Sequence, residues 1–374
     1  MAQIGTPAPG WNRFEGLSRP AAAAVLALLA LLMLLGFSGG ESNGSAAIEA
    51  RVTSTMSQRP PVEGMVGDHA LYLSILRDVE AGEPYYEAAA REQRANNYPL
   101  RPFVTVRLPT LAHLFAAIGL TGGALLVAAT GVAAILAWRR RLMSEPGLPG
   151  YARFAAMLIA ANLSQVLNRS WVLIHEVIAG TLIALALALY RPGRPWAAMA
   201  VLAAAVAIRE TVLPVAALLG CFALIDRDWR AAGAWLAFGL GALAMLAFHA
   251  AAVAGVTHAA DLSSPGWSSF GGWKTYLAFV HHTSAIRALP TWITVLLVPL
   301  ALLGWAAWRS RLALAVLGVQ LFYTALLMAI ARSDNFYWAM LVVPTLSMGL
   351  IFAPAALTAL VRSLARPSRA AFSG

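Results

Sequence analysis

Long apolar blocks recur along the whole chain, and they restrict its fold more than any other feature. Most blocks hold about 17 to 25 residues, enough for an α-helix to cross a hydrocarbon core of about 30 Å at about 1.5 Å per residue. With 60% hydrophobic and 12% charged residues, the chain has too little charge for the surface of a soluble 374-residue protein. A segment within lipid must satisfy its own backbone hydrogen bonds, and blocks of this length favour helices over barrel strands. The sequence therefore predicts an all-α, polytopic membrane protein.

The blocks predict about ten transmembrane helices within a single transmembrane domain that covers the whole chain, residues 1–374. The blocks lie near residues 21–37, 109–138, 151–167, 171–190, 196–208, 211–225, 231–254, 289–308, 311–331 and 337–361. The first block follows two arginines, as the apolar part of a signal peptide also would, but its length favours an anchor that is kept. The block at 151–167 is the weakest, and its loss would reverse the orientation of everything after it.

Lysine and arginine are unevenly divided between alternate loops, which predicts an orientation. With the N-terminus in the cytoplasm, that side receives Arg139, Arg140, Arg141, Arg153, Arg191, Arg194, Arg227, Arg230, Arg309, Arg311, Arg362, Arg366 and Arg369. The opposite short loops hold Arg169, Arg209, Lys274, Arg287 and Arg332. The net charge of +10 thus fits topology determinants at block ends, not a nucleic-acid-binding stripe. We expect a multi-pass protein of a bacterial inner membrane with both termini in the cytoplasm.

Two segments on the outer side are long enough to contain structure of their own, residues 38–108 and about 255–287. The first begins rich in Gly, Ser and Pro and then becomes amphipathic, with apolar residues near helical spacing over 71–79. We expect helices there that lie along the membrane surface and are interrupted at Gly82 and Pro84. The segment 38–108 would then be an extracytoplasmic loop inserted between the first two transmembrane helices.

Ionisable residues interrupt or flank the apolar blocks on the outer side, at similar depth. They form the pairs Asp68 with His69, His175 with Glu176, Arg209 with Glu210, and Arg332 with Asp334. One ionised side chain at the bilayer centre costs about 2.5 to 3.5 kcal/mol, so Glu176 should face a protein partner or a water-filled cavity. Together the four pairs predict one shared extracytoplasmic cleft, with Lys274 as a weaker candidate from the second outer segment.

Each pair also has a structural interpretation without chemistry. Asp68 could cap the helix that begins beside it, since Asp is a favoured N-cap residue. His175 with Glu176 could be an interhelical hydrogen-bond pair. Arg209 with Glu210 could be a loop ion pair worth about 0 to 1 kcal/mol. Arg332 with Asp334 could be an anchor beside an aromatic belt.

Motifs of other chemistries do not occur in the sequence. It contains no P-loop, no GxGxxG after a strand, no HExxH and no GxSxG. His258 and Asp261 have nearly helical spacing for metal ligands but lack a third ligand. The single cysteine, Cys221, excludes an intrachain disulfide and a cysteine metal cluster. No metal site is predicted, and the need for a divalent cation stays open.

Four short motifs lie at the outer ends of the predicted helices. They are GDHALYLSILRDVEAGEPYYEA in the first outer loop, HEVIAG at His175–Gly180, AIRET at Ala207–Thr211 and SDNFYWAMLVVP at Ser333–Pro344. With this topology the chain resembles the GT-C superfamily of membrane glycosyltransferases, which take sugars from polyprenyl-phosphate carriers. Two features depart from the family pattern: Asp68 lies farther beyond the first helix than the key acid of many members, and His69 stands where protein mannosyltransferases have Glu.

The resemblance implies an enzyme that moves a hexose or pentose from a polyprenyl-phosphate-linked donor to a glycan, lipid or protein acceptor at the periplasmic face, with inversion. Asp68 would be the catalytic base for the acceptor hydroxyl. The cations would hold the phosphate and the carboxylates would orient them or bind sugar hydroxyls. The predicted substrate-binding residues are His69, His175, Glu176, Arg209, Glu210, Lys274, Arg332 and Asp334.

Two other classes of protein also fit a chain of many membrane helices. A transporter or lipid flippase keeps charges inside its helical bundle, but it more typically shows discontinuous helices, polar residues near the bilayer midplane and an internal repeat. A non-catalytic subunit of a polymer-assembly system would carry the same pairs without chemistry. The position of the charged pairs at the membrane edge, beneath a long loop, favours the transferase.

Overall fold

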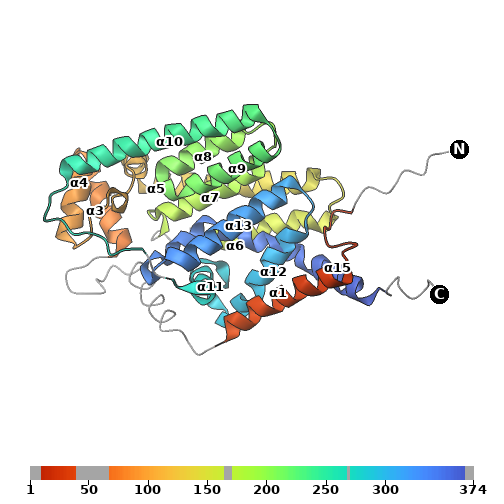
Figure 1. Ribbon diagram of the computed structural model, residues 1–374. Coiled ribbons are helices and arrows are strands. Elements are labelled where there is room, and N and C mark those ends of the chain that lie inside the picture. The colour runs from red at the N-terminus through yellow and green to blue at the C-terminus, as the bar shows by residue number, and fades with distance from the viewer. Residues whose placement is uncertain (1–9, 39–66, 164–170, 268–269, 367–374) are drawn as a thin grey trace, which may run out of the picture.

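A computed structural model describes residues 10–38, 67–163, 171–267 and 270–366, and these residues form helices without a β-sheet (Figure 1). Two isolated bridges are the only extended pairings in this described part of the chain. The predicted all-α fold is confirmed.

Four helical segments are long and apolar enough to cross a membrane: α1 (Arg19–Phe37), η1 with α5 (Phe103–Ser144), α10 (Trp229–Val256) and α13 (Arg311–Ile330). The bent pair Val343–Ile351 and Ala353–Ala365, whose axes differ by 50°, makes a fifth if the two parts form one span. By length and composition, the chain is a multi-pass membrane protein with four or five candidate spans among the described residues. The other spans of the predicted ten stay a prediction.

The other apolar blocks form shorter helices, which are α6 (Ala155–Leu163), α7 (His175–Leu189), α8 (Trp196–Ile208), α9 (Leu213–Ile225) and α12 (Thr291–Ala307). The longest of them, α12, has 17 residues. It covers about 25 Å at about 1.5 Å per residue, less than a hydrocarbon core of about 30 Å. These helices pack among the long ones, and α7 contacts both α5 and α8 in the largest hydrophobic core.

Two amphipathic helices form where the sequence predicts them, α3 (Asp68–Glu80) and α4 (Tyr85–Ala95). The turn between them contains Gly82, whose φ of 94° lies in the left-handed region that favours glycine. The apolar faces of both helices pack with Val253 of α10. The earlier part of the predicted loop, residues 39–66, lies outside the described residues, and the position of α3 and α4 on a membrane surface stays a prediction.

α5 (Thr110–Ser144) is interrupted at Gly119, where φ is 71° and ψ is 162°. Without the break, the 35 residues of α5 would measure about 50 Å at about 1.5 Å per residue, well beyond a hydrocarbon core of about 30 Å. The break leaves a short first part of α5 packed in one hydrophobic cluster with α3, while a longer part runs through the bundle.

The two ends of the helix bundle carry different elements (Figure 1). We call the end with α3 and α4 the α3 end; α1 starts and α15 (Ala353–Ala365) finishes at the opposite end. The remaining described elements are η1 (Phe103–Thr105), η2 (Gly150–Phe154), η5 (Glu210–Val212), α11 (Gly272–Thr283), η6 (Ala285–Ala288), η7 (Ser333–Leu341), α14 (Val343–Leu346) and η8 (Ser347–Ile351).

Candidate functional site

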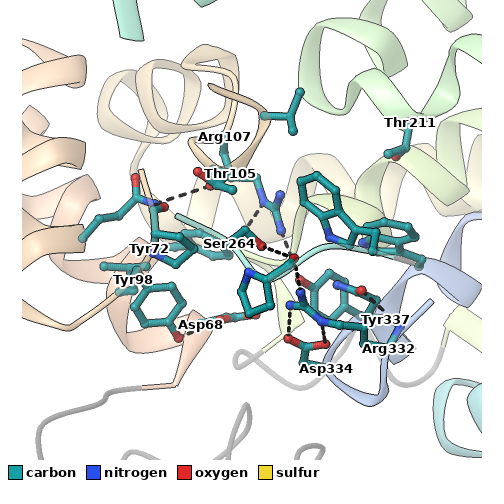
Figure 2. A pocket seen from close by; sticks show the side chains of 18 of the residues that line it. Asp68, Tyr72, Tyr98, Thr105, Arg107, Thr211, Ser264, Arg332, Asp334 and Tyr337 are labelled. Carbon is teal, nitrogen blue, oxygen red and sulfur yellow. Dashed lines mark hydrogen bonds and ion pairs between the residues drawn. The ribbon is translucent and has the colours of Figure 1, made fainter. Parts of the chain in front are cut away.

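A cavity of about 630 Å³ lies at the α3 end of the bundle (Figure 2). Its walls come from α3, α4, the segment before α5, the junction of α8 with η5, the segment after α10, and η7. Segments far apart in the sequence therefore meet at one place. Five of the nine predicted site residues line it: Asp68, Arg209, Glu210, Arg332 and Asp334.

Asp68 is the first residue of α3, and its side chain points to the cavity instead of capping the helix. The N-cap residue is Gly67, which makes no side-chain cap, and the Tyr98 hydroxyl donates a hydrogen bond of 2.7 Å to Oδ1 of Asp68. The capping interpretation of Asp68 is therefore wrong. Burial raises the pKa of the Asp68 carboxyl, although the Tyr98 hydrogen bond and the charge of Arg107 act in the opposite direction. A carboxylate with a raised pKa is a stronger base than one in water.

A buried ion cluster lies deeper in the same wall. Arg209 follows the last residue of α8 with 2% of its surface exposed, and its Nε donates a hydrogen bond of 2.6 Å to Oε1 of Glu176 at the start of α7. Its Nη1 donates to Glu210. Two carboxylates thus surround one guanidinium, and such a buried charge is stable only while its partners remain. The cluster holds the three side chains in fixed positions. Nε and Nη1 of Arg209 already donate to carboxylates and are not available to a ligand.

Arg107 is the guanidinium in the cavity that has no carboxylate partner among the described residues. Its Nε donates a hydrogen bond of 3.0 Å to the Tyr72 hydroxyl, and its Nη2 donates one of 3.2 Å to the Tyr337 hydroxyl (Figure 2). The sequence prediction did not include this residue. A usable signal existed, because Arg107 precedes the apolar block at 109 by two residues, as Arg209 precedes the block at 211.

The backbone around Arg107 is held from two helices. The Tyr85 hydroxyl of α4 donates a hydrogen bond of 2.7 Å to the carbonyl of Arg107. His249 of α10 contacts the Val106 carbonyl through Nε2 at 3.1 Å, and its Nδ1 lies 3.1 Å from the Tyr86 hydroxyl. Because a carbonyl only accepts, Nε2 must be the donor and Nδ1 must accept from Tyr86. These contacts fix the direction in which the Arg107 side chain leaves the backbone.

Arg332 and Asp334 form a bidentate pair at the start of η7. Nε and Nη2 of Arg332 donate hydrogen bonds of 3.0 Å and 2.6 Å to the two carboxylate oxygens of Asp334. Nη1 donates a third, of 2.7 Å, to the carbonyl of Pro265 in the segment after α10 (Figure 2). The pair therefore connects two walls of the cavity. The interpretation of Arg332 and Asp334 as an anchor beside an aromatic belt did not include this contact.

Gly180, in the HEVIAG stretch, lets α7 lie directly against η7. A Cβ atom at this position would overlap the backbone carbonyl of Met340. A larger residue would therefore displace η7, the element that carries Tyr337 and Asp334 into the cavity. The HEVIAG stretch thus supplies close helix packing through Gly180 as well as the charged residue Glu176.

Four predicted site residues do not line the cavity, and one of them, Glu176, is connected to it through its hydrogen bond with Arg209. His175 is buried next to Glu176 and packs edge-on against Tyr72, with ring centroids 5.0 Å apart. It therefore supports one of the tyrosines that hold Arg107. His69 on α3 and Lys274 on α11 are not among the lining residues. No group of three His, Cys, Asp or Glu side chains in the described ranges could hold a metal ion.

Comparison of the chain with protein-family models, with curated proteins and with solved structures gives no match. The function is therefore inferred from the residues and the geometry of the cavity.

Proposed function

We propose that the chain is a membrane glycosyltransferase that moves a sugar from a polyprenyl-phosphate carrier to an acceptor hydroxyl, with inversion. The observation that carries this proposal is the combination of a carboxylate with a raised pKa, Asp68, and a guanidinium without a carboxylate partner among the described residues, Arg107, in one cavity. A base and a phosphate-binding cation are the two groups that such a transfer requires.

In the proposed reaction, the acceptor oxygen attacks the anomeric carbon while its proton passes to Asp68. The bond between the anomeric carbon and the phosphate oxygen breaks, and the electron pair stays on the carrier phosphate. One displacement inverts the anomeric centre. Tyr98 occupies Oδ1 of Asp68 and leaves Oδ2 for the acceptor proton.

Arg107 takes the role that the sequence prediction gave to Arg209, Arg332 or Lys274. The Tyr72 and Tyr337 hydroxyls orient its guanidinium without neutralising it, so its charge is available to the phosphate. Arg209 is enclosed by Glu176 and Glu210, and Arg332 is paired with Asp334. We assign these two arginines a structural role, in which their ion pairs fix the shape of the cavity and contribute to its electrostatic field.

The proposal includes the side of the membrane. The arginine-rich loops would face the cytoplasm and the cavity would face the periplasm of a bacterial inner membrane, with about ten spans. No nucleotide sugar is supplied there, which favours a carrier lipid as donor; a glycan, lipid or protein would be the acceptor. To test this orientation, single cysteines would be placed in a Cys221→Ser background and labelled with a membrane-impermeant thiol reagent. Arg287→Cys, at an exposed position, should react from outside intact cells.

Consumption of a polyprenyl-phosphate sugar by the purified protein, followed by mass spectrometry, tests the activity. Asp68→Asn should abolish turnover while the protein stays folded. Asp78→Asn is the matched control, because Asp78 lies on the same helix and pairs with Arg91 away from the cavity. Equal turnover by wild type and Asp68→Asn would refute the role of Asp68.

One observation favours the transporter alternative, the 50° bend between η8 and α15, because transporters often contain broken helices. The two functions differ in product. A transporter in sealed vesicles would move the lipid-linked sugar intact, whereas a transferase separates sugar from carrier phosphate. Intact translocation by the Asp68→Asn variant would favour the transporter.

A further inference from the structure

A second hollow, of about 460 Å³, lies where α10 ends, on the other side of the segment before α5. Leu100, Arg101 and Phe103 line this hollow, while Val104 and Thr105 of the same segment line the cavity. The hollow is therefore separate from the proposed active site.

The polar part of the hollow carries positive charge. Nε and Nη2 of Arg101 donate hydrogen bonds of 3.1 Å and 2.6 Å to the backbone carbonyl of Asp261, and Arg101 has no ion pair in the described part of the chain. The Asp261 carboxylate is engaged elsewhere, by Arg94 at 2.7 Å and 2.9 Å and by the backbone N–H of His258 at 2.6 Å. The charge of Arg101 is thus not neutralised, and His258 lines the hollow with it.

The apolar part of the hollow runs along the last turns of α10. It is lined by Ala250, Val253 and Ala254, with Phe103 on the facing segment. The two alanines leave space that larger side chains would fill. α10 is a candidate span of which only 17% of the apolar window is buried by protein, so most of its surface is available to lipid.

We propose that this hollow binds one anionic phospholipid, with the phosphate at Arg101 and His258 and an acyl chain along Ala250 and Ala254. A cation at the end of a membrane helix with an apolar groove below it matches the order of groups along a phospholipid. A zwitterionic lipid carries a cation of its own, which Arg101 would repel. This inference is independent of the proposed transferase activity.

Native mass spectrometry of the full chain, delipidated and titrated with phosphatidylglycerol or phosphatidylcholine, tests the proposal. We expect wild type to retain phosphatidylglycerol in preference, and Arg101→Gln to weaken that binding about fivefold, the effect of one charge at a membrane surface. Arg101→Lys should keep the preference. Arg287→Gln, at an exposed arginine of η6, is the matched control and should change nothing.

Two further arms separate a lipid site from other occupants. Ala254→Trp should fill the groove and weaken the binding of phosphatidylglycerol without altering the thermal midpoint of unfolding. Inorganic phosphate at matched concentration should not displace the lipid, because it lacks the acyl contacts. Equal retention of both lipids by wild type, equal behaviour of Arg101→Gln and Arg287→Gln, or displacement by phosphate alone would overturn the proposal.

Discussion

The α3 end of the bundle and the opposite end both contain arginines at helix termini, but the two sets have different surroundings. At the opposite end, Arg141 pairs with Glu145 on its own helix terminus and donates to the carbonyl of Tyr190, and Arg311 at the start of α13 pairs with Asp226 at the end of α9. At the α3 end, Arg107 and Arg209 come from different segments to one cavity wall with buried carboxylates and tyrosines.

Residue type and position at the end of an apolar block therefore do not define a site. One carboxylate partner each neutralises Arg141 and Arg311 at the opposite end, and the part-exposed pair of Arg311 with Asp226 adds little stability in water. The arginines of the α3 end depend on tertiary packing, with Glu176 on α7 and Tyr337 on η7. Convergence of separate elements on one cavity is the feature that supports chemistry there.

The largest expected difference between the two ends is in stability. Glu176→Gln removes one partner of the fully buried Arg209 and should destabilise the fold by about 3 to 5 kcal/mol. Asp226→Asn removes the partner of the part-exposed Arg311 and should cost at most about 1 kcal/mol. Thermal unfolding of both variants in one detergent measures the difference. Equal midpoints would show that the two ion pairs are energetically alike.

The next effect concerns activity. Arg107→Gln should lower kcat/KM for the lipid-linked sugar by about 10²- to 10³-fold, the usual cost of losing one preorganised donor to a developing anion. Arg311→Gln, the matched arginine of the opposite end, should retain nearly full kcat/KM. Circular dichroism checks that both variants fold. A fully active Arg107→Gln would remove Arg107 from the proposed site.

The apolar blocks of the sequence predicted the helices well because burial in lipid imposes a long, uniform pattern. Arg209 could be predicted as a site residue because a charge next to an apolar block is costly and therefore conspicuous, and Asp68 because it stands at the start of an amphipathic helix in a motif with a family resemblance. Arg107 stands in the same position before the block at 109, but it also ends a long polar segment in which an arginine is ordinary. Tyr72, Tyr98 and Tyr337 carry no such signal, since their hydroxyls matter only through the partners that tertiary packing brings to them.

The number of spans could be predicted only in part. The block at 196–208 has only 13 residues and α8 has the same bounds, whereas α5 and α10, with 35 and 28 residues, extend beyond their blocks at 109–138 and 231–254. Where a block ends as a helix depends on turns and on packing against neighbours. Lys274 was predicted from charge alone, and the fold places it on α11, outside the cavity lining.

A smaller effect should follow from changing the support behind Arg107. His249→Leu removes the donor to the Val106 carbonyl and should raise KM for the lipid-linked sugar about tenfold with little change in kcat, because the guanidinium loses its position. His249→Gln keeps an N–H donor and should rescue KM. Loss of kcat and KM together in both variants would indicate general unfolding instead.

The smallest effect is a shift in pH dependence. The Tyr98 hydrogen bond lowers the pKa of Asp68, which burial raises. Tyr98→Phe removes that stabilisation of the carboxylate, so the pKa should rise further. Because the proposed base must be deprotonated, the acid limb of the kcat/KM profile should move to higher pH, and activity should return at alkaline pH. Tyr151→Phe, at an exposed tyrosine of η2, should leave the limb in place.

The claim that Asp68 and Arg107 act in one transition state is tested most directly by a double-mutant cycle on sugar transfer. Asp68→Asn, Arg107→Gln and the double variant would be compared with wild type by mass spectrometry of carrier and product. Residues that stabilise the same transition state are not independent, so the double variant should be little slower than the slower single variant. If the two losses simply multiply, Asp68 and Arg107 act independently; if the wild type leaves the lipid-linked sugar intact, the protein does not catalyse this transfer.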